Sequence, residues 1–198
     1  GWPRRSWNAW LQNRSMLKNS RSNHLNMEPA AAQQLMIAYL YPRPVILVSV
    51  QTPTHRNIFP MDLIGALERS GLFSLALRST NVSQPVMRDV RRVALSTIPA
   101  TMKATVYQLA QHHKTPLQDW SELAFPVRPS REFAIPVVAQ APRVRELTIV
   151  HSQEVGIHTF FLGRVSSDES LASVDQLHHT AGFHQAYRRK RHMPFADV

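Results

Sequence analysis

The run Arg78-Ser79-Thr80-Asn81-Val82-Ser83 places one guanidinium, three hydroxyl groups and several backbone amides in a segment rich in turn-forming residues. An arginine can bind two phosphate oxygens at once, and a hydrogen bond to a charged group contributes on the order of 1.5 to 3 kcal/mol. Backbone amides at the start of a helix, which we expect directly afterwards, add to the attraction. The run is therefore a candidate anion site. Because Ser, Thr and Asn are also common turn formers, an ordinary solvated loop is the alternative.

Other kinds of site are poorly supported by the residues. The ten histidines raise the question of a metal ion, but His112-His113 and His178-His179 are adjacent pairs whose side chains diverge on a helix or a strand. The chain has no H-E-x-x-H motif, no G-x-S-x-G motif and no cysteine, and neither the P-loop nor the G-x-G-x-x-G pattern occurs. We therefore expect no bound metal, no hydrolase nucleophile and no phosphate-binding glycine loop.

The net charge of +10 lies mostly at the two ends of the chain. Residues 1–28 carry five basic residues against Glu28 (+4), and residues 185–198 carry four against Asp197 (+3), which leaves +3 for the middle. This is a weak footprint for a duplex, so we do not expect a nucleic-acid partner. The N-terminal segment resembles a transit peptide in composition, whereas Trp7, Trp10 and Leu11 near helical spacing favour an arm that packs on the protein or on a partner subunit.

Membrane insertion and export are not indicated. The longest purely apolar run, Val45 to Val48, is far shorter than the roughly 20 residues of a membrane-spanning helix. No apolar segment of a secretory signal follows the N-terminal arginines, and a chain without cysteine is compatible with a reducing compartment. We expect a soluble, cytoplasmic protein.

Short β-rich runs must position the candidate anion site. In Val45–Val50 every residue except Ser49 is apolar, and we expect this strand to be buried on both faces. Glu68–Gly71 predicts a hairpin turn in which glycine supplies a positive φ. The other runs that predict strands are Asn57–Leu67, Leu72–Leu77, Val93–Ile98, Arg145–Ser152 and Ile157–Val165, with a further short run at Glu132–Val138. Six strands with few helices predict a mostly β protein that forms a closed antiparallel barrel.

Two helices are predicted between these strands. Val86–Arg92 follows Pro85, which suits a first helical turn. Pro99–His112 is amphipathic, with Thr101 available as its N-cap. The proline-rich stretch Lys114–Arg131 predicts a structured loop.

Four segments in order resemble the flavin reductase family: PRPVILVSV at 42–50, NIFPMDLIG at 57–65, LRSTN at 77–81 and GIHTFFLGRV at 156–165. The segment AGFHQAYR at 181–188 is similar to the C-terminal part of one branch of that family. The resemblance covers roughly residues 40 to 170. It implies a six-stranded antiparallel Greek-key barrel, the FMN-binding split barrel, which works as a homodimer.

The resemblance also implies a site. It places the flavin ring beside a loop that offers mainly backbone groups, carried over to Asn57, Ile58, Phe59, Pro60, Met61 and Asp62. Simple burial of Phe59 and Met61 in the barrel core is the alternative. The flavin phosphate contacts fall on Arg78, Ser79, Thr80, Asn81 and Ser83. His158 stands where many members have a histidine near the nicotinamide, although Ile157 replaces the acidic residue that usually precedes it.

The function that the resemblance implies is hydride transfer from NAD(P)H to flavin, with FMN as the expected cofactor and FAD or riboflavin as substitutes. The implied partners are a second copy of the chain and a flavin-dependent oxygenase. We expect an N-terminal arm at 1–40, the flavin reductase-like barrel at 41–170 and a basic C-terminal extension at 171–198. A flavin-binding barrel with another role, or a basic interaction module, are the alternatives, because fold does not determine reaction.

Overall fold

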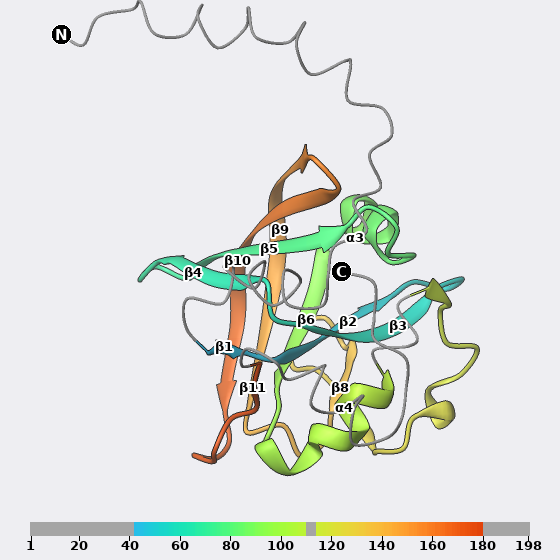
Figure 1. Ribbon diagram of the computed structural model, residues 1–198, viewed down its shortest axis with the longest axis vertical. Coiled ribbons are helices and arrows are strands. Elements are labelled where there is room, and N and C mark those ends of the chain that lie inside the picture. Colours follow the sequence, from blue (N-terminus) through green and yellow to red (C-terminus); the bar gives the residue numbers. More distant parts are fainter. Residues whose placement is uncertain (1–41, 110–113, 180–198) are drawn as a thin grey trace, which may run out of the picture. The chain divides into compact units, whose positions relative to one another are not determined.

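The computed structural model describes residues 42–109 and 114–179 (Figure 1). The chain divides into two units, Gly1–Ala38 and Tyr39–Val198, and all described residues belong to the second. The predicted N-terminal arm and most of the C-terminal extension therefore lie outside the described residues, as do residues 181–188.

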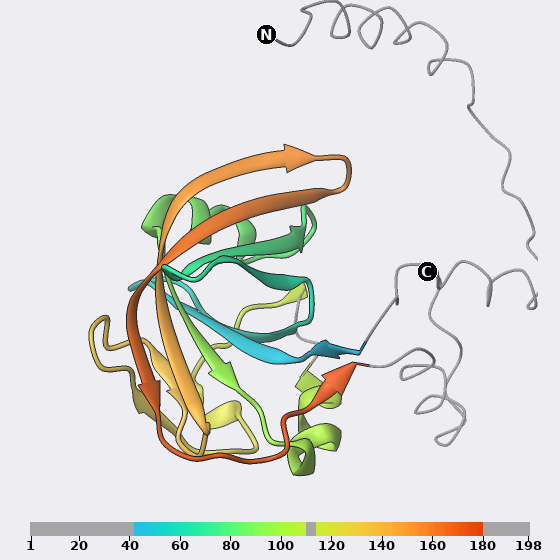
Figure 2. The same ribbon diagram turned by 90° about the vertical axis from the view of Figure 1, so that its left-hand side faces the viewer.

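A seven-stranded antiparallel sheet dominates the described part of the chain, in the order β3-β2-β6-β9-β10-β5-β4. Its two longest strands, β9 and β10, form a hairpin that curves strongly (Figure 2). The mostly β, antiparallel barrel-type fold is confirmed. The strands are β2 (Ile46–Gln51), β3 (Arg56–Met61), β4 (Ile64–Glu68), β5 (Leu72–Arg78), β6 (Arg92–Thr97), β9 (Arg143–Val155) and β10 (His158–Ser170).

The predicted single strand over Asn57–Leu67 is wrong, and its division raises the strand number of the sheet from six to seven. β3 ends at Met61 and β4 begins at Ile64, and the two lie at opposite edges of the sheet. Between them Asp62 forms an ion pair with Arg43, and the Leu63 carbonyl accepts a hydrogen bond from the Ala76 amide at 2.9 Å. These contacts turn the chain away from β2 and start its pairing with β5.

Two small sheets complete the β structure. β1 (Arg43–Pro44) pairs with β11 (His178–His179), and β7 (Val127–Pro129) pairs with β8 (Pro136–Val138). The strand predicted over Glu132–Val138 is confined to its last three residues. The amides of Glu132 and Phe133 instead donate to the buried Glu146 carboxylate, at 2.8 and 2.7 Å, which holds the preceding residues in a turn.

The helix predicted at 86–92 has the same length in the structure but begins two residues earlier, and the helix predicted at 99–112 is shorter than predicted. α3 (Gln84–Val90) has a proline in its first turn, as expected. The predicted helix at 99–112 consists of a 3₁₀ turn, Ala100–Met102, followed by α4 (Lys103–Leu109), with residues 110–113 outside the described part. Thr101 is not an N-cap, because it lies inside the 3₁₀ turn, which begins after Pro99 without a side-chain cap. The structured loop expected at 114–131 contains another 3₁₀ turn, Trp120–Glu122, capped by Asp119.

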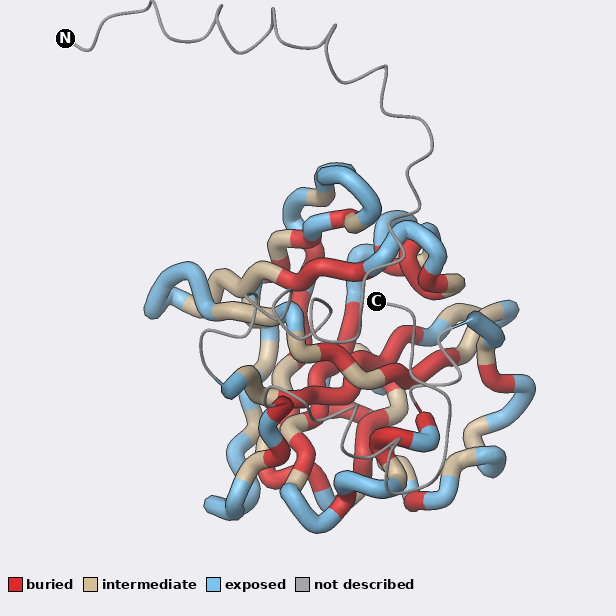
Figure 3. Tube along the Cα trace, viewed as in Figure 1, coloured by how far each residue is buried: buried red, intermediate tan, exposed pale blue. Residues whose placement is uncertain are grey.

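The buried residues lie mainly on the strands of the large sheet (red in Figure 3), and they form two core clusters, one on each face of β2. Leu47 packs with α4 and β8 on one face, whereas Val48 and Val50 pack on the other face with β5, β10 and α3. The predicted burial of Val45–Val50 on both faces is confirmed, which explains why all of its residues except the buried Ser49 are apolar.

Candidate functional site

Three turns meet beside the end of β5: the segment Arg78–Ser83, which we call the Arg78–Ser83 turn; the turn between β2 and β3, which contains His55; and the turn between β9 and β10. The Ser79 amide donates to the Ile157 carbonyl at 2.9 Å, and the His55 ring lies 3.1 Å from the Ser83 hydroxyl. The turn predicted to bind an anion is thereby fixed by its two neighbours.

Arg78 and His158 lie side by side on one face of the sheet. They are cross-strand partners of β5 and β10, and such partners project from the same face. Arg78 is exposed, and its side chain has no hydrogen bond or ion pair with any residue in the described ranges. The candidate phosphate ligand and the candidate nicotinamide-side residue are thus brought together, and the guanidinium is available to an anion.

The outer side of the Arg78–Ser83 turn presents further donors. Ser79 and Thr80 are exposed. The backbone bonds of the turn run from Asn81 to the Arg78 carbonyl and from Gln84 to the Asn81 carbonyl, so they use neither the Thr80 nor the Val82 amide. Two hydroxyls, the guanidinium and these amides form a donor set that fits a phosphate dianion.

The inner side of the same turn is buried and hydrogen-bonded. The Asn57 amide nitrogen donates to the Ser83 hydroxyl oxygen at 2.8 Å, and the Ser83 backbone amide donates to the Asn81 side-chain oxygen at 2.9 Å. Ser83 and Asn57 are completely buried. Three residues that the resemblance assigns to flavin are therefore brought together by direct contacts, and these contacts shape the turn.

The segment carried over as a flavin-side loop has a different conformation. Asn57–Met61 belongs to strand β3, so the expectation of a loop there is wrong. Phe59 and Met61 are buried in the core with Leu75 and Phe161, while Ile58 packs on the opposite face. Pro60 is half-buried. Because β3 is an edge strand, one row of its backbone groups remains outside the main ladder.

Asp62 belongs to a separate polar cluster that joins the end of β3 to the small β1–β11 sheet. Its carboxylate accepts hydrogen bonds from Arg43, at 2.8 Å, and from the His179 ring. Burial by itself would raise the pKa of Asp62, but the hydrogen bond from His179 and the electrostatic interactions with His179 and Arg43 outweigh it, so the pKa lies below the ordinary value. The cluster ties the strand ends together.

The sequence analysis did not identify three residues of the site region, His55, Gln84 and Thr159. His55 contacts Ser83, 28 residues away, and Gln84 donates to the Thr159 hydroxyl at 2.9 Å, which joins α3 to β10. Burial lowers the pKa of His55. The T-P-T-H sequence at 52–55 indicates a polar turn, but it does not indicate that His55 contacts Ser83.

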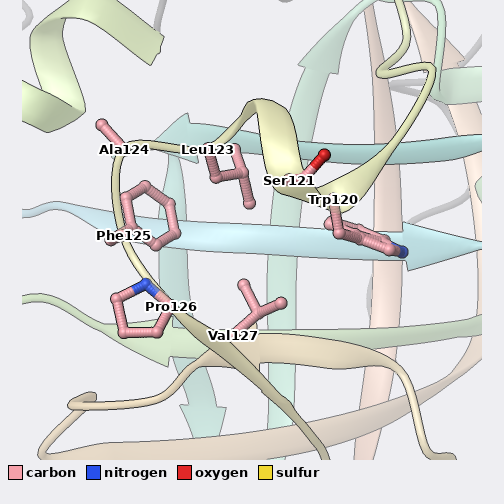
Figure 4. A pocket seen from close by; sticks show the side chains of 7 residues that line it. All are labelled: Trp120, Ser121, Leu123, Ala124, Phe125, Pro126 and Val127. Carbon is pink, nitrogen blue, oxygen red and sulfur yellow. The ribbon is translucent and has the colours of Figure 1, made fainter.

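A hollow in the described surface lies elsewhere. It is lined by Trp120, Ser121, Leu123, Ala124, Phe125, Pro126 and Val127, as Figure 4 shows. None of these seven side chains is titratable in the physiological range, so this lining provides neither an acid nor a base.

In the described ranges, no group of three His, Asp or Glu residues is arranged to hold a metal ion. None of the helices described there is both long and apolar enough to cross a membrane.

Several solved structures with the same architecture are of proteins named as flavin reductases, flavin oxidoreductases or FMN-binding proteins. The NADH:FAD oxidoreductase of Streptomyces globisporus C-1027 is 20% identical, with 79% of this chain and 92% of that chain covered and a TM-score of 0.67. The styrene monooxygenase flavin reductase of Pseudomonas putida S12 is 15% identical, with 76% and 91% covered and a TM-score of 0.59. An FMN-binding protein from Thermus thermophilus is 21% identical, with 67% and 74% covered and a TM-score of 0.58. These similarities show the split-barrel fold.

The comparison with curated proteins finds no match. The family model described as "Flavin reductase like domain" matches residues 38–186, which is most of the chain and includes all the candidate site residues. It confirms the resemblance carried by the segments between residues 42 and 165. The chain therefore belongs to the flavin reductase like domain family.

Proposed function

We propose that this protein binds FMN and reduces it with NADH or NADPH. The observation that carries the proposal is the Arg78–Ser83 turn. Its inner side is locked by buried hydrogen bonds, while on its outer side the Arg78 guanidinium has no partner among the described residues. The family model that matches the chain is described as a flavin reductase like domain. A site held rigid before the ligand arrives loses less entropy on binding.

The phosphate group of the flavin fits the outer side of this turn. Arg78 would bind phosphate oxygens, with Ser79 and Thr80 supplying hydroxyl donors. Asn57, Asn81 and Ser83 have their side-chain groups engaged in the turn itself, so we assign them a supporting role. FAD can present a phosphate to the same donors, whereas riboflavin lacks one. We therefore expect FMN and FAD to bind more tightly than riboflavin.

The ring of the flavin would lie at the Pro60 end of β3, because Pro60 is half-buried whereas Asn57, Ile58 and Phe59 are almost completely buried. The buried side chains of Phe59 and Met61 would keep the strand in place. When bound, the flavin supplies the centre that accepts a hydride from nicotinamide. His158 would help to orient the nicotinamide, because it lies beside Arg78 on the same face.

A second copy of the chain would cover this face. Val155, Ile157 and Phe160 are exposed to 51%, 65% and 42% on and beside the β9–β10 turn. Apolar side chains grouped in this way on a surface usually mark a contact with another protein. A symmetric homodimer buries one such patch against another identical patch. The dimer would enclose the site between the two copies.

The same scaffold also supports a second candidate function, binding of flavin without reductase activity. The FMN-binding protein from Thermus thermophilus is named only for binding and has the same fold. A reductase would in turn require an acceptor, and a flavin-dependent oxygenase is the acceptor class we propose, since one structural neighbour is named as the reductase of a monooxygenase. We place these reactions in the cytoplasm.

Spectroscopy of the purified protein tests both candidates. Addition of FMN is expected to give stoichiometric quenching of flavin fluorescence, and anaerobic addition of NADH or NADPH is expected to bleach the bound flavin. Binding without bleaching by either nucleotide would reject the reductase and leave the binding protein. Absence of FMN, FAD and riboflavin binding would reject both.

A further inference from the structure

A histidine outside the segments that resemble the family, His55, contacts the buried side of the Arg78–Ser83 turn. His55 lies in the turn between β2 and β3, and its Nε2 atom is 3.1 Å from the Ser83 Oγ atom. The Asn57 Nδ2 atom approaches the same oxygen at 2.8 Å. Ser83 is completely buried, so these two side chains are the neighbours with which its hydroxyl can pair.

The orientation of the Asn57 amide is determined by its other contact. Its Oδ1 atom accepts a hydrogen bond from the Ile58 backbone amide at 3.0 Å, so the Nδ2 atom is the one that faces Ser83. An amide nitrogen can only donate. The Ser83 oxygen therefore accepts from Asn57, and the hydroxyl proton is left to be donated elsewhere.

His55 is the acceptor for that proton. A neutral imidazole with its proton on Nδ1 has a free lone pair on Nε2, which can accept from Ser83. A protonated imidazole carries hydrogen on both nitrogens, so the Ser83 oxygen would then receive two donors while its own proton lost its acceptor. A buried hydroxyl without an acceptor is costly. The cluster is thus fully paired only when His55 is neutral.

The surroundings of His55 favour the neutral state. Burial lowers the pKa of His55, and no charge in the described ranges contributes to the shift. Arg56 donates to the Gln118 carbonyl at 2.6 Å, and Arg88 pairs with Glu154. The other charged side chains on the elements around this cluster include Arg78, Asp89, Asp119 and Glu122, and all four are exposed.

We propose that His55 is a positioning residue that holds the Arg78–Ser83 turn in its phosphate-binding shape when neutral and releases it when protonated. The Ser83 side chain does not cap α3, so among the described residues its hydroxyl pairs only with Asn57 and His55, and the Ser83 amide carries the constraint to the Asn81 side chain. Flavin affinity then falls as pH falls through the pKa of His55. This inference rests on the proposed flavin site.

Two substitutions separate the hydrogen bond from the titration. In His55→Gln a side-chain carbonyl can replace Nε2 as the acceptor without gaining a proton, whereas His55→Ala removes the acceptor. His178→Gln is the matched control, because His178 is exposed on β11 and its ring contacts only the Gln176 carbonyl among the described residues.

The dissociation constant for FMN is measured between pH 5 and pH 8. At pH 8 we expect His55→Gln to bind within about threefold of the unsubstituted protein and His55→Ala to bind about three- to tenfold more weakly, the loss of one hydrogen bond. Towards pH 5 the unsubstituted protein and His178→Gln should lose affinity more steeply than His55→Gln. The FMN phosphate itself titrates near pH 6, but this contribution is common to all four proteins and cancels in their ratios.

A second readout uses the flavin-free protein. The imidazole ¹⁵N shifts of His55 should indicate the Nδ1–H tautomer at pH 8, and exchange of the Asn81 and Ser83 amides should accelerate in His55→Ala. Identical pH profiles for His55→Gln and the unsubstituted protein would overturn the inference, as would unchanged amide exchange in His55→Ala. If FMN does not bind at pH 8 at all, the proposed function is refuted, and the tautomer and exchange data still decide the role of His55.

Discussion

Replacement of Arg78 by alanine is expected to weaken FMN binding with little effect on folding. The guanidinium is exposed and has no partner in the described ranges, so its removal breaks no intramolecular bond described there. A substitution of this kind changes the free energy of unfolding by less than about 0.5 kcal/mol. Its cost should therefore appear in the dissociation constant and not in the melting curve.

The magnitude follows from the bonds that Arg78 would make. One hydrogen bond between a guanidinium and a phosphate contributes about 1.5 to 3 kcal/mol, and 1.4 kcal/mol corresponds to a factor of ten. We expect the FMN dissociation constant of Arg78→Ala to rise about 10- to 100-fold. Arg78→Lys keeps the charge but cannot bind two phosphate oxygens in the way a guanidinium does. Its FMN dissociation constant should therefore lie between those of the unsubstituted protein and Arg78→Ala.

Fluorescence quenching with FMN and riboflavin is the assay. Riboflavin has no phosphate, so its affinity should be the same in Arg78→Ala and in the unsubstituted protein. Arg69→Ala, at the exposed β4–β5 turn, is the matched control and should change neither affinity. Equal weakening of FMN and riboflavin would show that Arg78 does not contact the phosphate, and an unchanged FMN affinity would refute the assignment of the turn.

Three other perturbations test separate parts of the structure. Asp62→Asn should lower the free energy of unfolding at neutral pH by about 1.5 to 3 kcal/mol. Because the folded-state pKa of Asp62 is depressed, the stability that its carboxylate contributes is complete above the unfolded pKa of about 3.9 and is lost as pH falls through the folded pKa. Denaturation curves of Asp62→Asn and of the unsubstituted protein should therefore converge in acid. Gly71→Ala should cost about 1 to 2 kcal/mol, since Gly71 has φ of +89° and an added Cβ would lie 3.2 Å from the Val165 side chain; an unchanged melting temperature would contradict this. Phe160→Asp should convert the proposed dimer to a monomer in light scattering while Val174→Asp, exposed outside the β9–β10 hairpin, does not; equal masses for both variants would argue against the interface.

Local pattern was sufficient for the elements whose signal is carried by adjacent residues. The mostly apolar run at Val45–Val50 identified a strand buried on both faces, Pro85 marked the first turn of α3, and Gly71 marked the hairpin between β4 and β5. Each of these signals arises within one element, from burial or from backbone sterics, and needs no knowledge of the partner.

Elements defined by distant contacts were misjudged. Asn57–Leu67 reads as one strand because its apolar residues are contiguous, yet the pairing of Asp62 with Arg43 and of Leu63 with Ala76 divides it between two edges of the sheet. Thr101 has the side chain of an N-cap, but the backbone there forms a 3₁₀ turn that begins after Pro99. Glu132–Ile135 has β-forming residues whose amides instead bond to Glu146 or Ser130.

The candidate site divides in the same way. The sequence alone was enough to single out Arg78–Ser83 as a candidate anion site, because a guanidinium next to hydroxyls and turn formers is a property of neighbouring residues. That Arg78 faces His158, that Asn57 lies under Ser83, and that His55 completes the cluster were decided only by the tertiary structure. Strand register and the packing of turns depend on the sum of many weak contacts between residues tens of positions apart, and no local pattern contains that sum.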